Sequence, residues 1–246
     1  MADLNALITG SSSGIGLAIA KHLLESLPEL QIVGLSRRPG ALEENPRFTH
    51  WKSELGDPDI AFKRGRRYLQ EKQECNLLVH AAGAGLFKPS FEWSTQDLVS
   101  LTNLNLVSPM ALTGCLTQRL RKSRGLVVFI GSTSSQERAP LGAAYSATKA
   151  GLHHFSENYF QENRKHGVRT LHLCCGMTDT EFYDKEKFAP KHGEEFSVQL
   201  TAIAELVSFF FQGPGKNSNP SHLVLEPQKV GIRKKNASQE CPMQEF

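Results

Sequence analysis

Short apolar runs alternate along the chain with longer stretches in which apolar residues recur at helical spacing. Seven of the runs have the length and apolar character of strands: "NALIT" (5–9), "QIVGLS" (31–36), "FTHWKS" (48–53), "NLLVHAA" (76–82), "LVVFIG" (126–131), "RTLHLCC" (169–175) and "HLVLEP" (222–227). The stretches with helical spacing predict helices over 14–27, 58–73, 95–121, 143–164 and 198–211.

This alternation predicts an α/β, doubly wound Rossmann fold, with a seven-stranded, mostly parallel sheet and helices on both faces. The strands are almost continuously apolar, which is typical of strands buried on both faces. No internal repeat or linker divides the chain, so we expect residues 1–228 to form a single dinucleotide-binding catalytic domain. Residues 229–246 are polar and patternless, and we expect them to form a disordered tail.

Composition and charge narrow the class of protein. The 246 residues are enough to bury a substantial core, and 39% hydrophobic with 22% charged residues is ordinary for a soluble globular protein. A net charge of +3 is too small to indicate a nucleic-acid partner. Two basic clusters, "KRGRR" at 63–67 and "RKSR" at 121–124, are expected to be solvated faces, because neither is interleaved with aromatic residues.

The sequence carries no signal for export, membrane insertion or metal binding. The N-terminus lacks a basic segment followed by an apolar one, and no apolar run approaches the roughly 18 residues of a membrane span. The 5 cysteines include no CxxC pair and show no metal-ligand spacing with histidine. We therefore expect free thiols, no metal site, no membrane partner and a cytoplasmic location.

Glycines mark the turn between the first strand and the first helix. "LITGSSSGIGLAI" places Gly10, Gly14 and Gly16 there, with Ser12 and Ile15 between them. A Gly/Ser cluster is often only a turn. Here a strand precedes it and an amphipathic helix follows, and glycines at such a turn let the backbone approach a pyrophosphate whose charge the helix N-terminus favours. The segment therefore predicts a dinucleotide-binding turn.

The end of the second strand, "GLSRRPG", bears on which dinucleotide is bound. A fold that selects NAD usually has an acid about twenty residues beyond the glycines, to hold the ribose 2′-hydroxyl. Ser36 falls at this distance and is followed by Arg37 and Arg38, with no carboxylate. Guanidinium groups beside a hydroxyl suit a 2′-phosphate, so the segment favours NADP. The alternative is that both arginines only decorate a surface turn.

Three of the 4 tyrosines have a lysine four residues further on: Tyr68 with Lys72, Tyr145 with Lys149, and Tyr183 with Lys187. Spacing alone does not distinguish a catalytic pair from neighbours on a helix face. Only Tyr145 lies on a predicted helix with a serine, Ser132, thirteen residues upstream at the end of a predicted strand. This context favours Tyr145 and Lys149.

The TGxxxGIG pattern at 9–16, together with Ser132, Tyr145 and Lys149, resembles the compact branch of the short-chain dehydrogenase/reductase family, over roughly residues 4 to 228. The resemblance implies that these three residues are catalytic, with Asn105 as the fourth member of the set. A phenol has a pKa of about 10, and a lysine ammonium one turn away lowers it, so Tyr145 would act as the general acid. Lys149 would also bind the ribose hydroxyls, and Asn105 would hold a water for proton relay.

The same resemblance implies further cofactor-binding residues, after the third, fourth and sixth strands: Glu54, Leu55, Ala82, Gly83, Gly176, Thr178 and Thr180, with Tyr145 and Lys149. Two segments depart from the family pattern. "HAAG" at 80–83 stands where the family has NNAG, and "CG" at 175–176 stands where it has PG. We expect cofactor binding to survive the first change, because the small residues still let the backbone pass close to the cofactor.

These features together predict an NADPH-dependent oxidoreductase that reduces a small-molecule carbonyl to an alcohol by hydride transfer. The alternative is a non-catalytic NADPH-binding sensor or scaffold protein on the same fold. The substrate is expected to lie under the segment 181–196. Resemblance to the family also implies a homodimer or homotetramer, paired through the helices that carry Asn105 and Tyr145.

Overall fold

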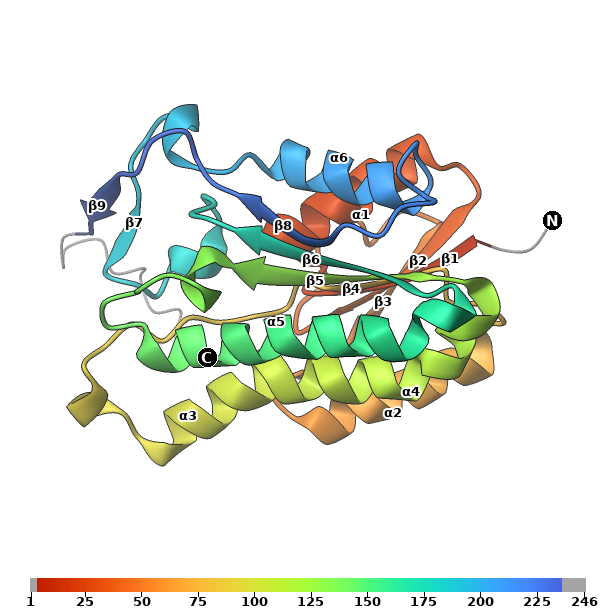
Figure 1. The fold of residues 1–246 in the computed structure, drawn as a ribbon, viewed down its shortest axis with the longest axis horizontal. Coiled ribbons are helices and arrows are strands. Elements are labelled where there is room, and N and C mark those ends of the chain that lie inside the picture. The colour runs from red at the N-terminus through yellow and green to blue at the C-terminus, as the bar shows by residue number, and fades with distance from the viewer. Residues whose placement is uncertain (1–3, 236–246) are drawn as a thin grey trace.

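A parallel sheet of seven strands forms the centre of the computed structural model, which describes residues 4–235 (Figure 1). The strands are β1 Leu4–Thr9, β2 Leu30–Ser36, β3 Phe48–Lys52, β4 Leu77–His80, β5 Leu126–Ser132, β6 Arg169–Cys175 and β8 Ser221–Leu225. Their order is β3-β2-β1-β4-β5-β6-β8, and every neighbouring pair is parallel. The doubly wound α/β fold predicted from the sequence is confirmed.

Helices cover both faces of the sheet (Figure 1). One face carries α1 Gly14–Ser26 and α6 Leu200–Phe211, and the other carries α2 Pro58–Glu71, α4 Ser108–Ser123 and α5 Ala143–Asn163. Successive residues of a strand point to opposite faces, so Leu7 and Ile8 belong to different apolar clusters. Because all seven strands are parallel, their carboxyl ends meet at one edge of the sheet.

The helix predicted over 95–121 has an irregular middle. Helix α3 Thr95–Thr102 passes into a π-helical turn, η2 Asn103–Val107, before α4 begins. Thr95–Ser123 as a whole is long and apolar enough to cross a membrane, the one such helix in the described residues 4–235, and a single helix of this kind is weak evidence. This segment packs against α2 and α5, so its apolar character is explained by its place in the helical layer of the fold.

A second, two-stranded sheet lies beside the carboxyl ends of the main sheet (Figure 1). Strand β7 Phe188–Pro190 pairs antiparallel with β9 Ile232–Lys234. The sequence did not predict it, because strands of three residues are too short to show a period. The prediction of disorder from residue 229 is therefore wrong at β9, whereas residues 236–246 lie outside the described part. This pairing ties the C-terminal segment to 181–196.

Candidate active site

The glycine turn follows β1 directly. Gly10 and Gly14 adopt φ angles of +67° and +52°, a left-handed conformation that glycine reaches without steric penalty. A Cβ at Gly10 would lie 2.8 Å from the backbone nitrogen of Ala82, and a Cβ at Gly16 would collide with the Gly10 carbonyl oxygen. The three glycines therefore keep the turn, the start of α1 and the end of β4 in close contact.

Residues after β4 connect this turn to the catalytic candidates. The Thr9 hydroxyl accepts hydrogen bonds from the backbone N–H groups of Ala81–Ala82, each 3.1 Å long. At Gly83 a Cβ would lie 3.4 Å from Asn105 Oδ1 and 3.6 Å from Lys149 Nζ. Ala82 and Gly83 thus lie between the glycine turn and Lys149, where the sequence predicted a cofactor contact.

His80, which stands in place of a family amide, has a structural role. It is buried, its Nε2 lies 2.8 Å from the Thr113 hydroxyl of α4, and its ring stacks on Phe129 at 5.1 Å. Burial lowers the pKa of His80 to about 3, so the imidazole is neutral at physiological pH. The histidine side chain holds α4 on the sheet, while the backbone of the next residues faces the site.

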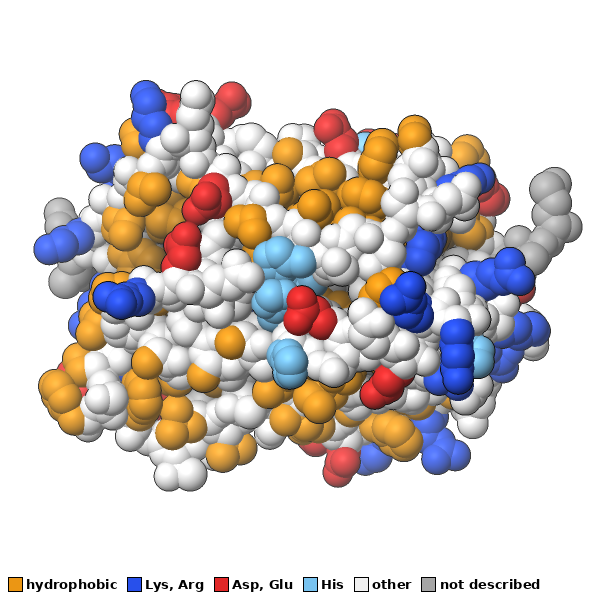
Figure 2. Space-filling view, in the orientation of Figure 1, with side chains coloured by type: hydrophobic (Ala, Val, Ile, Leu, Met, Phe, Trp, Pro, Cys, Tyr) orange, Lys and Arg blue, Asp and Glu red, His pale blue; other side chains and the backbone are white. Residues whose placement is uncertain are grey.

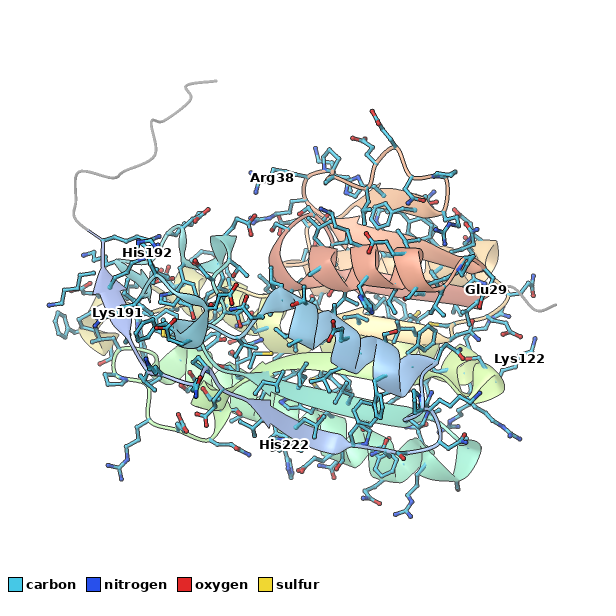
Figure 3. The ribbon with its side chains drawn as sticks, turned by 90° about the horizontal axis from the view of Figure 1, so that it is seen from above. Glu29, Arg38, Lys122, Lys191, His192 and His222 are labelled. Carbon is cyan, nitrogen blue, oxygen red and sulfur yellow. The ribbon has the colours of Figure 1, made fainter. Side chains whose placement is uncertain are left out.

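The arginine turn after β2 lies beside the glycine turn. Ser36 is buried, and its hydroxyl donates a 2.7 Å hydrogen bond to the Arg38 carbonyl, so it shapes the turn. A Cβ at Gly40 would lie 2.8 Å from the Cα atom of Ser12. Arg37 and Arg38 are exposed, and Figure 3 shows Arg38 at the surface of the molecule.

Ser132, Tyr145 and Lys149 are buried together. Ser132 ends β5, and Tyr145 and Lys149 lie one turn apart on α5. The Lys149 ammonium donates a 2.9 Å hydrogen bond to the Ile130 carbonyl and lies 5.8 Å from the centre of the Tyr145 ring. The exposed fractions of the three predicted residues are only 8%, 6% and 5%, so they can act on a group that is shielded from water.

Burial changes the protonation of this pair. Contrary to the expectation that Lys149 would lower it, the pKa of the Tyr145 phenol is raised above its ordinary value by burial, and a hydrogen bond with Ser132 partly opposes the shift. Burial also lowers the pKa of Lys149 to about 8. At pH 7 the phenol therefore keeps its proton and Lys149 is mostly charged, which is the state required of a proton donor with a cation beside it.

The two other Tyr/Lys pairs lie in different surroundings. Tyr68 is fully buried in the core, where its ring packs edge-on against Trp51 and its hydroxyl donates to the Glu74 carbonyl at 3.2 Å. Tyr183 lies in the short helical turn Glu181–Tyr183, within the segment that covers the site. Among the three, Tyr145 is the one that adjoins the strand-end Ser132, and it lies on the helix that brings Lys149 close to Gly83.

Asn105 occupies the middle of the π-helical turn and is 1% exposed. Its Nδ2 donates to the Ala84 carbonyl at 2.9 Å and to the Thr148 hydroxyl at 3.2 Å, and its Oδ1 accepts the Ala84 N–H at 3.0 Å. Both amide N–H groups are therefore used, and one lone pair of Oδ1 remains for a water. Single π turns often occur at functional sites. Here the turn positions Asn105 to hold the segment after β4 beside α5.

Three phenylalanines, which we call the aromatic cover, lie over Tyr145: Phe87, Phe182 and Phe188. Phe87 and Phe182 lie 5.2 Å and 5.8 Å from the Tyr145 ring, and Phe188 lies 5.1 Å from Phe87. Phe87 could not be predicted from the sequence, because its loop after β4 carries no local signal. Phe182 and Phe188 were predicted only as part of the covering segment 181–196. The cover makes the approach to Tyr145 apolar.

Of the remaining residues predicted to bind the cofactor, some lie at the site and others are buried in the core. A Cβ at Gly14 would lie 3.4 Å from the Thr180 side chain, so the segment after β6 meets the glycine turn. Thr178 donates to the Gly176 carbonyl at 3.2 Å and is buried. Leu55 is buried in the core, whereas Glu54 is exposed after the end of β3. Ile15 packs against the core from α1.

The cysteines of the described residues, Cys75, Cys115, Cys174 and Cys175, are free thiols, and Cys241 lies outside this range. Burial raises the pKa of Cys75 and of Cys175 to about 12, so both remain protonated.

Within residues 4–235, no group of three His, Cys, Asp or Glu side chains is placed to hold a metal ion.

Comparison with known proteins gives one consistent result. Residues 4–190 match the family model described as short chain dehydrogenase. The uncharacterized oxidoreductase DltE of Bacillus subtilis strain 168 is 32% identical over 224 residues, which cover 87% of this chain and 85% of that protein.

Two solved structures have the same fold. The alcohol dehydrogenase of Thermococcus sibiricus, complexed with 5-hydroxy-NADP, has a TM-score of 0.79 and 22% identity, covering 95% of this chain and 99% of that one. A 4-hydroxyisoleucine dehydrogenase complexed with NADH has a TM-score of 0.79 and 20% identity, covering 91% and 97%. Because one structure holds an NADP derivative and the other NADH, the shared fold does not decide between the two dinucleotides.

Proposed function

Because the chain belongs to the short-chain dehydrogenase family and is an oxidoreductase, we propose that it reduces a carbonyl group of a small molecule to an alcohol with NADPH. The observation that carries the proposal is the buried cluster of Ser132, Tyr145 and Lys149 at the carboxyl end of β5, beside the glycine turn. A sensor or scaffold has no use for a buried proton donor with a cation next to it.

The residues present fit a dinucleotide. The turn Gly10–Gly16 offers backbone without side chains at the start of a helix, which suits a pyrophosphate. Arg37 and Arg38 would hold the 2′-phosphate, Lys149 the ribose hydroxyls and Thr180 the nicotinamide amide. When bound, NADPH supplies a hydride. Side chains of this protein would do the rest: they would hold the substrate and supply its proton.

Ser132, Tyr145 and Lys149 have different roles toward the substrate. Ser132 hydrogen-bonds the substrate oxygen and orients it. Tyr145 donates its proton to that oxygen as negative charge develops there, and the Lys149 ammonium stabilises the phenolate that remains. Asn105 keeps the segment after β4 in register with α5 through its hydrogen bonds to Ala84.

The direct test is a fluorescence titration of the purified protein with NADPH and, in parallel, with NADH. We expect NADPH to bind at least about tenfold more tightly, since one charge-assisted hydrogen bond to the 2′-phosphate is worth about 1.5–3 kcal/mol. A panel of carbonyl compounds is then assayed with the preferred dinucleotide. If neither dinucleotide binds, the proposal of dinucleotide-dependent carbonyl reduction fails, whereas binding without turnover of any carbonyl supports the sensor or scaffold.

Cofactor preference is tested by the double variant Arg37→Gln/Arg38→Gln. We expect NADPH affinity to fall about 10- to 100-fold while NADH affinity stays unchanged, because the charged partners of the 2′-phosphate are lost. The matched control is Lys63→Gln/Arg66→Gln, which removes the same charge from exposed positions of α2. Equal losses for both dinucleotides, or equal losses in the control, would show that the arginines act only through net charge.

The aromatic cover supports a substrate with a flat apolar ring next to the carbonyl. We expect Phe87→Ala to raise KM for an aryl ketone about three- to tenfold, with a smaller effect on a short aliphatic ketone, since one aromatic pair is worth about 0.5–1.5 kcal/mol. Phe91 is 86% exposed in the same connection and serves as the control in Phe91→Ala. Parallel changes for both ketones would argue against ring recognition.

Two wider expectations also remain proposals. The homodimer or homotetramer is supported by Val99, Val107 and Met110, which expose apolar side chains on α3, η2 and α4, the region expected to form the interface. A cytoplasmic location is supported by the free thiols, which persist in a reducing compartment.

A further inference from the structure

The fold brings together two basic segments that are far apart in the sequence. "RKSR" at 121–124 ends α4, and "RKH" at 164–166 follows α5. Together they line a depression of about 520 Å³, which we call the basic pocket: Arg121, Lys122, Arg124, Arg164, Lys165, His166 and Gly167. Figure 2 shows Lys and Arg side chains gathered at this end of the molecule, and Figure 3 shows Lys122 at the opposite end from Lys191 and His192.

Basic residues often lie at helix C-termini because they offset the negative end of the helix dipole, so this contribution must be compared with the charge of the pocket. Each helix C-terminus carries about half a negative charge, which favours cations in the last turn. Two helix ends therefore account for about one of the five Lys and Arg charges that line the pocket. No acidic side chain lines it, and across residues 4–235 no ion pair joins any of the five to a carboxylate. The pocket thus keeps a positive excess that helix capping does not explain.

Two of the cations, Arg121 and Arg164, are oriented by neighbours that are themselves uncharged. Arg121 donates from Nε to the Asn163 side-chain oxygen at 2.8 Å, and Asn163 is buried. The Arg164 guanidinium lies 5.6 Å from the centre of the Phe160 ring. Both contacts orient a guanidinium without neutralising it. Lys122 and Lys165 are exposed, and each directly follows one of these two arginines in the sequence.

Arg124 occupies a backbone position that glycine suits better. Its φ angle is +50°, the left-handed conformation that ends many helices and that glycine usually supplies. A glycine, Gly125, follows immediately. The side chain of Arg124 lies against Gly167, where a Cβ would come within 3.0 Å of it. The chain therefore keeps a cation in the pocket at a conformational disadvantage.

We propose that the basic pocket binds a compact anion with several negative charges, of the oligophosphate class. Five cations around a small depression match phosphate groups, which accept charged hydrogen bonds from both guanidinium and ammonium groups. The lining has no Phe, Tyr or Trp side chain on which nucleic-acid bases could stack. It also lacks the apolar side chains that insert into a membrane surface.

The experiment is calorimetric titration of the full chain with inorganic tripolyphosphate, at low salt and at physiological salt. Wild-type protein is compared with Lys122→Gln/Lys165→Gln, which removes two exposed cations from the pocket, and with the control Lys63→Gln/Arg66→Gln on α2. We expect the first variant to bind at least about tenfold more weakly and the control to bind like wild type. Wild-type affinity in the pocket variant, or an equal loss in the control, would overturn the proposal.

Two further variants separate this site from others. Arg37→Gln/Arg38→Gln leaves tripolyphosphate binding intact if the basic pocket is the site, and abolishes it if the anion occupies the dinucleotide turn instead. Arg124→Gly is expected to raise the melting temperature, because glycine fits the left-handed position, and yet to weaken tripolyphosphate binding. A single-stranded oligonucleotide that competes at lower concentration than tripolyphosphate would show that the pocket serves a nucleic acid, against the proposal.

Discussion

Replacing Tyr145 with phenylalanine is expected to lower kcat for carbonyl reduction about 10²- to 10⁴-fold, with a much smaller effect on NADPH affinity. The phenol is buried, and burial holds its pKa above the ordinary value, so its proton is present at neutral pH. Phenylalanine keeps the ring contacts with Phe87 and Phe182 and removes only the proton donor. Turnover is measured by loss of NADPH absorbance, and binding by fluorescence titration.

The matched control for this prediction is Tyr183→Phe. Tyr183 also precedes a lysine by four residues and lies in the covering segment, next to Phe182 and Phe188. We expect this variant to keep kcat, because Tyr183 is not joined to Ser132 and Lys149. If Tyr145→Phe turns over at the wild-type rate, or if Tyr183→Phe loses as much, Tyr145 is not the general acid.

Periodicity in the sequence was enough to predict the main sheet, because each strand is a run of apolar residues bounded by turns. Strand β6, for example, is predicted and found over 169–175. Strands β7 and β9 could not be predicted in this way, since three residues show no period and the pairing joins segments over forty residues apart. The π-helical turn at Asn105 was likewise invisible, because its apolar spacing continues that of the flanking helices.

The residues of the candidate site likewise fall into those that local sequence spacing predicts and those that depend on contacts between distant segments. Motifs with fixed local spacing, such as the glycine turn and Tyr145 with Lys149, are readable because a few neighbouring residues define their geometry. The aromatic cover and the basic pocket depend on which loops and helix ends meet in space. So does the stack of His153, His172 and His222, contributed by α5, β6 and β8, with ring centres 4.4–5.9 Å apart. Spacing in one sequence carries no information about such meetings.

The burial on which the proposed catalytic role of Lys149 depends also makes this lysine unfavourable for folding. Its pKa falls from 10.5 to about 8 because the charged form is desolvated. A shift of this size corresponds to on the order of 3 kcal/mol of lost stability when the lysine is charged in both states. The hydrogen bond from Lys149 to the Ile130 carbonyl returns about 1 kcal/mol. Activity and stability are therefore opposed at this one side chain.

We accordingly expect Lys149→Met to be inactive. Without bound dinucleotide, we expect the free energy of unfolding of this variant at pH 7 to be about 2 kcal/mol higher than that of the wild type. The folded pKa lies below the unfolded one. The wild type therefore bears the full penalty below about pH 8 and loses it as pH rises toward 10.5, where the unfolded chain also releases its proton. Urea unfolding at pH 7, 8.5 and 10 measures this difference, with the exposed Lys63→Met as control. A variant less stable than wild type at pH 7, or a difference that does not shrink with pH, would show that Lys149 is not held charged against burial.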